Sequence, residues 1–203
     1  MKLHWSPRSP FVRKVMVVAH ERGVADRLTC VRTVAATAKP HPDLMTDNPL
    51  SKIPTLILDD GTVLYDSPVI CEYLDALDGA PKLFPNQPKA RMTALRRQAL
   101  GDGFLEMMVL LRDERARAHP SDAHMASTAA RKAAVLEGLD REAESLTTAP
   151  FGIGHISIGC ALSYLDFRYA DDDWRKGHLR LANWHAAFAG RPSVRATLPV
   201  DDS

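Results

Sequence analysis

The chain has 203 residues, enough to bury a substantial core as one large or two small domains. Its formal net charge is +1 and 25% of its residues are charged, which argues against nucleic acid or an anionic membrane as the main partner. No apolar run approaches the roughly 20 residues of a membrane span, and Met1 to Ser6 lack the apolar stretch of a signal peptide. We therefore expect a cytoplasmic protein.

The first 78 residues have the pattern of an α/β domain. Period-2 runs and turn residues predict short strands, and apolar residues at helical spacing predict two helices. In chain order the predicted elements are a strand at Lys2 to Trp5, a helix at Pro10 to Glu21, a strand at Leu28 to Arg32, an irregular or weakly helical stretch at 36–47, strands at Thr55 to Leu58 and Val63 to Tyr65, and a helix at Pro68 to Leu77. This βαβ and ββα order is the thioredoxin-like arrangement.

The rest of the chain is predicted to be helical. Prolines 81, 85 and 88 make residues 79–88 a linker. Helices are predicted at Lys89 to Ala118, Ser121 to Leu146, Ile153 to Tyr169 and Leu181 to Ala189. The tail from Arg191 has little core-forming character, and we assign residues 89–203 to one all-helical domain.

Serine precedes proline at the start of both N-terminal helices, as Ser9-Pro10 and Ser67-Pro68. Serine is a preferred N-cap and proline suits the first helical turn. Each helix would then present free N–H groups and a positive dipole end to an anion. Simple capping is the alternative for both serines.

A metal site is not expected. Cys30, Cys71 and Cys160 are widely spaced, with no Cys-x-x-Cys pair, and the eight histidines form no His-x-x-x-His cluster. The cysteines have mostly apolar neighbours, so we expect buried structural thiols.

Four motifs in this order resemble the glutathione transferase superfamily over nearly the whole chain, and most of all its small bacterial members that carry serine at the catalytic turn. The motifs are Ser6-Pro7-Arg8-Ser9-Pro10-Phe11-Val12-Arg13-Lys14-Val15, Asn48-Pro49-Leu50-Ser51-Lys52-Ile53-Pro54, Tyr65-Asp66-Ser67-Pro68-Val69-Ile70 and Ile158-Gly159-Cys160-Ala161-Leu162-Ser163-Tyr164-Leu165-Asp166-Phe167-Arg168. The resemblance implies a thioredoxin-like glutathione-binding domain (1–78) and an all-α domain (89–203) that carries the electrophile site. It also implies a detoxifying enzyme that conjugates the glutathione thiolate to a small hydrophobic electrophile.

The resemblance assigns roles to individual residues. Ser9 would stabilise the thiolate, with Ser6 as the competing hydroxyl. Pro54 would follow a cis peptide bond, so that Ile53 pairs with the glutathione backbone; from the sequence alone a trans proline is the alternative. Ser67 would hold the γ-glutamyl carboxylate and Asp66 would orient the amino group.

For the glycyl carboxylate of glutathione and for the electrophile, the resemblance gives several candidate residues instead of one. Lys52, or alternatively Lys39 or His41, would meet the glycyl carboxylate. Candidates for the electrophile wall, for which plain core packing is the alternative, are Met107, Met108, Leu111, Arg112, Tyr164, Phe167 and Arg168.

The chain departs from the family pattern at two places. Ser51 replaces the glycine usual before the lysine, which puts the loop geometry in question. Gly152-Ile153-Gly154-His155 stands where the family has a Ser/Thr-x-x-Asp capping box, so we expect a weaker helix cap.

Two rival functions remain open, along with the oligomeric state. One is glutathione-dependent thiol or peroxide reduction at the same site, and the other is a glutathione-binding or interaction module without catalysis. The resemblance implies a homodimer in which the N-terminal domain of one subunit packs on the helical domain of the other. Met92, Leu95 and Leu100 supply apolar surface for such an interface.

Overall fold

The computed structural model describes residues 1–79 and 83–202 of the chain. The chain divides into unit 1, Met1–Arg91 with Pro192–Ser203, and unit 2, Met92–Arg191. Part of the expected linker, residues 80–82, lies outside the described residues. The last twelve residues were assigned to the helical domain from the sequence, whereas the structure groups them with unit 1.

Unit 1 is built on a four-stranded mixed sheet of β1 (Lys2–Trp5), β2 (Thr29–Arg32), β3 (Thr55–Ile57) and β4 (Val63–Leu64). The strand order is β2-β1-β3-β4, with β1 parallel to β2 and antiparallel to β3, and with β3 antiparallel to β4. This topology confirms the expected βαβ and ββα arrangement.

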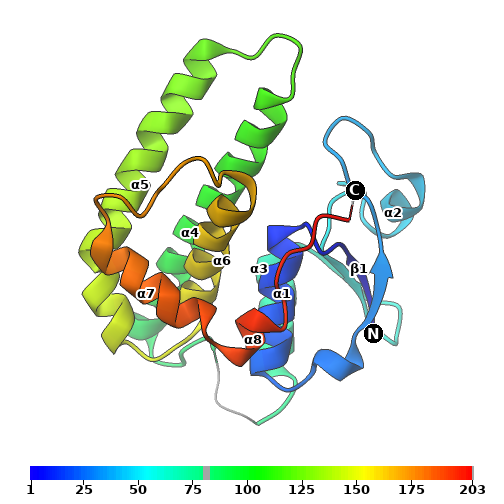
Figure 1. Cartoon of the computed structure of the whole chain (residues 1–203). Coiled ribbons are helices and arrows are strands. Elements are labelled where there is room, and N and C mark those ends of the chain that lie inside the picture. The colour runs from blue at the N-terminus through cyan, green and yellow to red at the C-terminus, as the bar shows by residue number, and fades with distance from the viewer. Residues whose placement is uncertain (80–82, 203) are drawn as a thin grey trace. The chain divides into compact units, whose positions relative to one another are not determined.

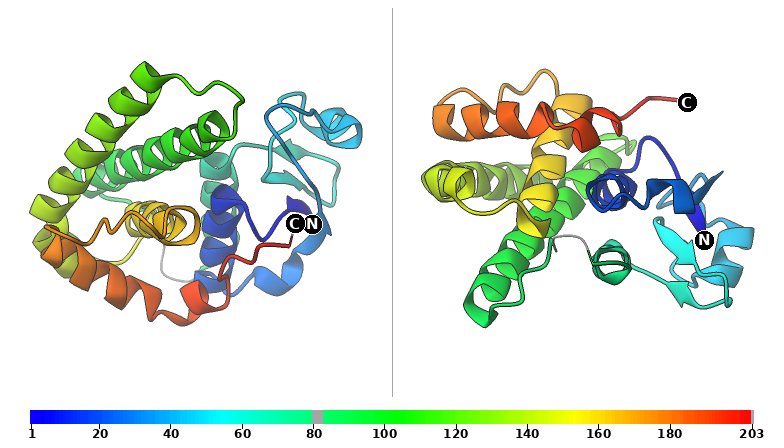
Figure 2. Two further views of the ribbon diagram at one scale, coloured as in Figure 1. Left: turned by 45° about the horizontal axis from the view of Figure 1, so that its top comes forward. Right: turned by 90° about the horizontal axis from the view of Figure 1, so that it is seen from below.

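Helices cover both faces of this sheet. Unit 1 contains α1 (Pro10–Glu21), the 3₁₀ turn η1 (Ala25–Arg27), α2 (Pro42–Asp47), α3 (Ser67–Ala76) and α8 (Pro192–Arg195). Figures 1 and 2 show α1 and α3 together on one side of the sheet and α2 on the other. Val12, Val15 and Val18 are buried at helical spacing on α1, as the apolar period predicts.

A buried ion pair joins the two helices on the shared face. The side chain of Arg22, just after α1, is fully buried, and its Nε lies 3.1 Å from Asp75 Oδ1 on α3. Asp75 also accepts the N–H groups of Leu83 and Phe84, each at 2.9 Å. One carboxylate therefore fixes both the end of α1 and the main chain at residues 83 and 84. Removing one partner of such a pair leaves a buried charge uncompensated.

Residues of the C-terminal tail complete unit 1. Val194 of α8 is fully buried, and its carbonyl accepts a hydrogen bond from Arg13 Nη2 at 3.4 Å. Ser193 donates its hydroxyl to Glu21 at the end of α1. This packing depends on one valine and several polar contacts. It therefore cannot be predicted from the tail's sequence, which has a low apolar content.

Unit 2 consists of most of α4 (Pro88–Arg115), α5 (Asp122–Thr148), α6 (Ile153–Arg168) and α7 (Leu179–Ala189). Residues 153–165 are all buried, so α6 is the central helix of the unit. A Cβ at Gly101 of α4 would lie 2.5 Å from the backbone of Ser157, and one at Gly159 would lie 2.4 Å from the Phe188 ring. Glycine at these two positions lets α4 and α7 approach α6 closely.

The described residues include no helix that is long and apolar enough to cross a membrane. Cys71 and Cys160 are buried as expected, but Cys30 is exposed on β2. The expectation failed for Cys30 because β2 is at the edge of the sheet and its four residues are all exposed.

The start of α6 is capped by a histidine. The N–H of Gly152 donates to His155 Nδ1 at 3.1 Å, so Nε2 carries the ring hydrogen and donates it to the Leu146 carbonyl at 3.1 Å. His155 thus supplies the acceptor that aspartate provides in the family's capping box. Gly152 has no side chain to return the second bond of that box, so half of the motif is retained.

We predict that protonation of His155 destabilises the protein as the pH falls. Burial lowers the pKa of His155 below its usual value, and the positive charges of Arg97 and Arg191 act in the same direction. In the unfolded chain this pKa returns to about 6.5, so at lower pH the unfolded state binds more protons than the folded state. The stabilisation is complete above about pH 7 and is lost as the pH falls below the unfolded-state pKa of about 6.5, at no more than about 1.36 kcal/mol per pH unit.

The matched control is His155→Asn, whose amide oxygen keeps an acceptor for the Gly152 N–H and which has no titratable side chain. Urea unfolding at pH 7.5 and 5.5 measures the effect. The wild-type midpoint should fall more than that of the variant. An equal fall in both proteins would show that His155 is not the group responsible.

Candidate functional site

Strand pairing brings three of the predicted site elements to one edge of the sheet. His4 pairs with Thr55, so the end of β1 lies beside the start of β3, and Leu56 pairs with Leu64, so the end of β4 lies there too. The Ser9 turn follows β1, the Lys52–Pro54 loop precedes β3, and Asp66–Ser67 follows β4. Residues that are far apart in the sequence therefore meet at this edge, all within unit 1.

Ser9 caps α1, as its sequence context predicts. Its Oγ accepts the N–H of Val12 at 3.3 Å, and its own N–H donates to the Ser6 carbonyl at 3.2 Å. Among the described residues, no acceptor binds the hydroxyl hydrogen of Ser9. The competing Ser6 is 6% exposed, and its Oγ accepts the N–H of Arg8 at 3.4 Å. Ser9 is half-buried and is thus the more accessible hydroxyl at the start of α1.

The C-terminal tail lies against the same turn. The N–H of Val200 donates to the Pro7 carbonyl at 3.4 Å, and Arg8 Nε lies 3.0 Å from Asp202 Oδ1. Arg32 at the end of β2 binds both oxygens of Asp202, at 2.6 and 2.8 Å. These hydrogen bonds from Arg32 hold the pKa of Asp202 below its usual value.

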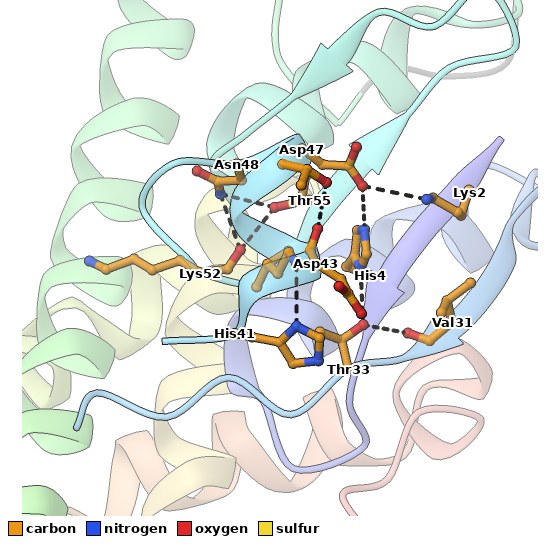
Figure 3. Close-up of polar contacts among 12 residues, drawn as sticks. Lys2, His4, Val31, Thr33, His41, Asp43, Asp47, Asn48, Lys52 and Thr55 are labelled. Carbon is orange, nitrogen blue, oxygen red and sulfur yellow. Dashed lines mark hydrogen bonds and ion pairs between the residues drawn. The ribbon is translucent and has the colours of Figure 1, made fainter. Parts of the chain in front are cut away.

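The loop before β3 is fixed by Asn48. Its Nδ2 donates to the Lys52 carbonyl at 3.1 Å and to Thr55 Oγ1 at 2.9 Å, and Thr55 Oγ1 donates to the same carbonyl at 2.8 Å. Figure 3 shows this cluster, with the Lys52 side chain pointing away from it. The Ile53–Pro54 bond is cis, which confirms the expectation taken from the family. No described residue binds the main-chain N–H or C=O of Ile53.

Ser51 adopts the backbone conformation that the family's glycine would favour. Its φ is +51°, in the left-handed region. Its Oγ accepts the N–H of His41 at 2.8 Å, and His41 Nδ1 in turn accepts the N–H of Leu44 as the cap of α2. Ser51 therefore adopts a strained backbone conformation, and its side chain forms a hydrogen bond that links the loop before β3 to the start of α2.

A buried histidine docks the other end of α2 on the sheet. His4 of β1 is 6% exposed; its Nε2 lies 2.8 Å from Asp47 Oδ2 and its Nδ1 lies 2.9 Å from Thr33 Oγ1. Lys2 Nζ lies 3.4 Å from the same Asp47 oxygen (Figure 3). The hydrogen bond with His4 and the charge of Lys2 hold the pKa of Asp47 below its usual value. Because Asp47 directly precedes Asn48, this link fixes the base of the loop.

The third element is the start of α3. The helix begins at Ser67, with Asp66 as the N-cap residue, one position earlier than the sequence predicted. Asp66 is exposed and its side chain forms no cap bond. Ser67 is 2% exposed, and its hydroxyl has no partner among the described residues. The first turn of α3 thus keeps hydrogen-bonding capacity at the same edge as Ser9.

Unit 2 contains the predicted electrophile wall. Met108, Leu111 and Tyr164 are at most 5% exposed, so they are largely core residues. Met107, Phe167 and Arg168 are half-buried and Arg112 is exposed. Unit 2 also has a pocket of about 610 Å³ around Phe151, His155, Trp184 and Phe188, which none of the predicted wall residues lines.

Sequence reasoning assigned no role to several residues that shape the site. Asn48 stands in an Asn-Pro pair, which is a turn signal, but its clamp on Lys52 cannot be read from that pair. The link between His4 and Asp47 spans 43 positions and leaves no local pattern. Lys39 and His41, the alternatives to Lys52, lie before and at the cap of α2. No group of three or more metal-binding side chains occurs in the part of the chain that is described.

Comparison with known proteins gives concordant matches. A family model for the glutathione S-transferase N-terminal domain matches residues 8–77. An uncharacterized GST-like protein of Escherichia coli K12, YibF, is 31% identical over 98% of this chain and 98% of its own length.

Solved structures of glutathione transferases are also similar to this chain. A glutathione transferase family member from Pseudomonas fluorescens Pf-5 with bound glutathione is 40% identical, covers 98% of this chain and 99% of that one, and superposes with a TM-score of 0.94. A second structure from that organism, with bound S-(propanoic acid)-glutathione, is 38% identical over 99% of this chain and 100% of that one, with a TM-score of 0.90.

The positive φ of Ser51 gives a test of how the loop before β3 is stabilised. We predict that Ser51→Ala lowers the free energy of unfolding by about 1 kcal/mol, because the bond to His41 is lost while the strain remains. Ser51→Gly loses the same bond but relieves a strain of similar size, so it should be nearly neutral. Urea unfolding of both variants measures the difference. Equal losses would mean that the positive φ of residue 51 costs nothing.

Proposed function

Because this chain belongs to the glutathione transferase superfamily, we propose that it conjugates the glutathione thiolate to a small hydrophobic electrophile, with Ser9 stabilising the thiolate. The observation that carries this proposal is the geometry of Ser9. Its oxygen is held by the Val12 N–H, while no described residue accepts its hydrogen. That hydrogen is available to a sulfur placed at the start of α1.

The chemistry requires a lower thiol pKa. A free thiol has a pKa of about 8.5, so at neutral pH only a few per cent is thiolate. A hydrogen bond from Ser9 and the positive end of the α1 dipole both favour the anion. Each pKa unit corresponds to about 1.36 kcal/mol, which one charge-assisted hydrogen bond together with a helix dipole can supply.

The remaining groups of unit 1 match the rest of the tripeptide. The N–H and C=O of Ile53 would pair with its backbone, beside the cis bond to Pro54. The first turn of α3, with the Ser67 hydroxyl, would bind the γ-glutamyl carboxylate, and the exposed Asp66 would meet the amino group. Lys52 would meet the glycyl carboxylate.

Conjugation is favoured over reduction by two observations. S-(propanoic acid)-glutathione, bound by the 38% identical neighbour, is a thioether of the kind that conjugation yields. In this chain two of the three cysteines are buried, and Cys30 pairs with Leu3 in the middle of β1, away from the end of β1 that leads to Ser9. No cysteine stands at the Ser9 turn to form a mixed disulfide with glutathione. This argues against a covalent intermediate with the enzyme but not against transfer of a glutathionyl group between two ligands.

The first test is binding. Calorimetry should detect glutathione binding at millimolar concentration, and Ser67→Ala should weaken it, because the Ser67 contact with the carboxylate is lost. No heat with the wild-type protein would remove the proposal and leave the interaction-module alternative. Turnover with a panel of electrophiles then separates conjugation from reduction.

The second test compares the two serines. We predict that Ser9→Ala raises the pKa of bound glutathione and lowers turnover, whereas Ser6→Ala, at a buried hydroxyl, does much less. Thiolate absorbance against pH measures the shift in each variant. A larger shift in Ser6→Ala would transfer the role to Ser6.

We further propose that the protein is a homodimer. Met92, at the start of unit 2, is 66% exposed, and Val69 of α3 is 45% exposed, which is apolar surface that a subunit interface would cover. Sedimentation at micromolar protein concentration should give twice the 22.4 kDa of one chain. A single species of 22.4 kDa would contradict the dimer, and Asp66 would then act without help from a second subunit.

A further inference from the structure

One face of α4 changes from apolar to basic toward its end. Met108, Leu111, Arg112 and Arg115 follow one another at helical spacing, so they lie on the same stripe of the helix. The first two are buried and the last two are exposed. The stripe therefore has an apolar inner part and a cationic outer part.

Two phenols from α6 and the residue after it lie beside this stripe. Tyr164 and Tyr169 are both buried, and their ring centroids lie 6.4 Å apart in an edge-to-face arrangement. Arg112 Nη1 donates to the Tyr164 hydroxyl at 3.3 Å, and the Tyr169 hydroxyl donates to the Met108 carbonyl. The guanidinium carbon of Arg115 lies 4.9 Å from the Tyr169 ring centroid. The arginines are thus held against a rigid aromatic surface.

Positive charge around the phenols exceeds negative charge. Besides Arg112 and Arg115, Arg168 on α6 stacks on Phe167 at 4.1 Å, and Lys132 of α5 is near enough to Arg115 to feel its charge. Burial lowers the pKa of Lys132, and repulsion from Arg115 lowers it further.

The nearby carboxylates already have partners. Asp113 accepts hydrogen bonds from Arg112, Asp172 binds Lys132, and Glu114 accepts the Ser121 N–H at 2.7 Å and pairs with Arg117. Within the described part of the chain, Arg115 contacts an aromatic ring and has no carboxylate partner. Its donors are the ones left for an external anion.

A guanidinium with open donors, held beside a phenol, suits a planar carboxylate. Resting on the proposed function, and on the expectation that Arg112 and Tyr164 line the electrophile site, we infer that the electrophile carries a carboxylate that binds Arg115, with Arg112 and Tyr164 beside it. A neutral electrophile would make no ion pair with the open donors of Arg115.

The test uses a matched pair of electrophiles, 4-chloro-3-nitrobenzoate and 4-chloro-3-nitrobenzamide. In each, the thiolate forms a C–S bond, the C–Cl bond breaks, chloride leaves with the electron pair, and the thiol proton goes to solvent. The two conjugates differ only in a carboxylate or a carboxamide. Calorimetry measures the affinity for each conjugate and so tests the contact between the carboxylate and Arg115 without turnover. The ratio of kcat/KM to the uncatalysed rate, measured with each electrophile, tests the same contact during the reaction.

We expect the wild-type protein to bind the carboxylate conjugate about tenfold more tightly than the amide, and Arg115→Gln to bring this ratio close to one. Arg141→Gln is the control, because it removes the same charge from an exposed residue of α5 that pairs with Glu137. Its ratio should match the wild type.

The outcomes separate the two proposals. Equal binding of both conjugates, or a ratio that survives Arg115→Gln, overturns the inference even if both electrophiles are conjugated. A ratio that depends on Arg115, without turnover of either electrophile, supports the carboxylate site and removes the conjugating function instead. If neither conjugate binds, both proposals fall.

Discussion

The antiparallel pairing of β1, β3 and β4 is the constraint on which the candidate site depends. It places the end of β1, the start of β3 and the end of β4 at one edge, and every proposed glutathione contact is on a segment that leaves the sheet there. A one-residue slip would turn Leu3 and Leu56, both fully buried, to the opposite face. The apolar core therefore fixes the register, and the register fixes which loops meet.

Polar contacts then set the shape of each loop, since these segments bury few apolar side chains. Asn48 and Thr55 share the Lys52 carbonyl, and the pairing of His4 with Asp47 anchors the helix that leads into that loop. A neutral hydrogen bond of this kind contributes about 1 kcal/mol net, and bonds to charged groups contribute more. Several such bonds hold the Ile53 backbone in place before any ligand arrives, so binding requires less ordering of the loop.

Features that could be read from the sequence have local causes. Apolar spacing and the serine–proline pairs predicted α1 and α3 to α7 to within a few residues, and the motifs predicted the cis bond before Pro54. Features that could not be read have partners far along the chain. His4 and Asp47, or Arg32 and Asp202, show no periodicity, and the buried Val194 lies in a tail of low apolar content. At the start of α6, the imidazole nitrogen of His155 takes the place of a carboxylate oxygen as the acceptor of the helix cap. A motif written in terms of residue types does not reveal this chemical equivalence.

The return of the last residues to unit 1 makes the helical unit an insertion within the sheet-containing unit. During synthesis the four strands emerge early, whereas Val194 and the carbonyl that Arg13 binds are made only after the helical unit. The face of α1 that packs on α8 therefore stays uncovered until the whole helical unit has been made. For the same reason, a recombinant chain cut after the helical unit would lose a buried side chain of the N-terminal unit.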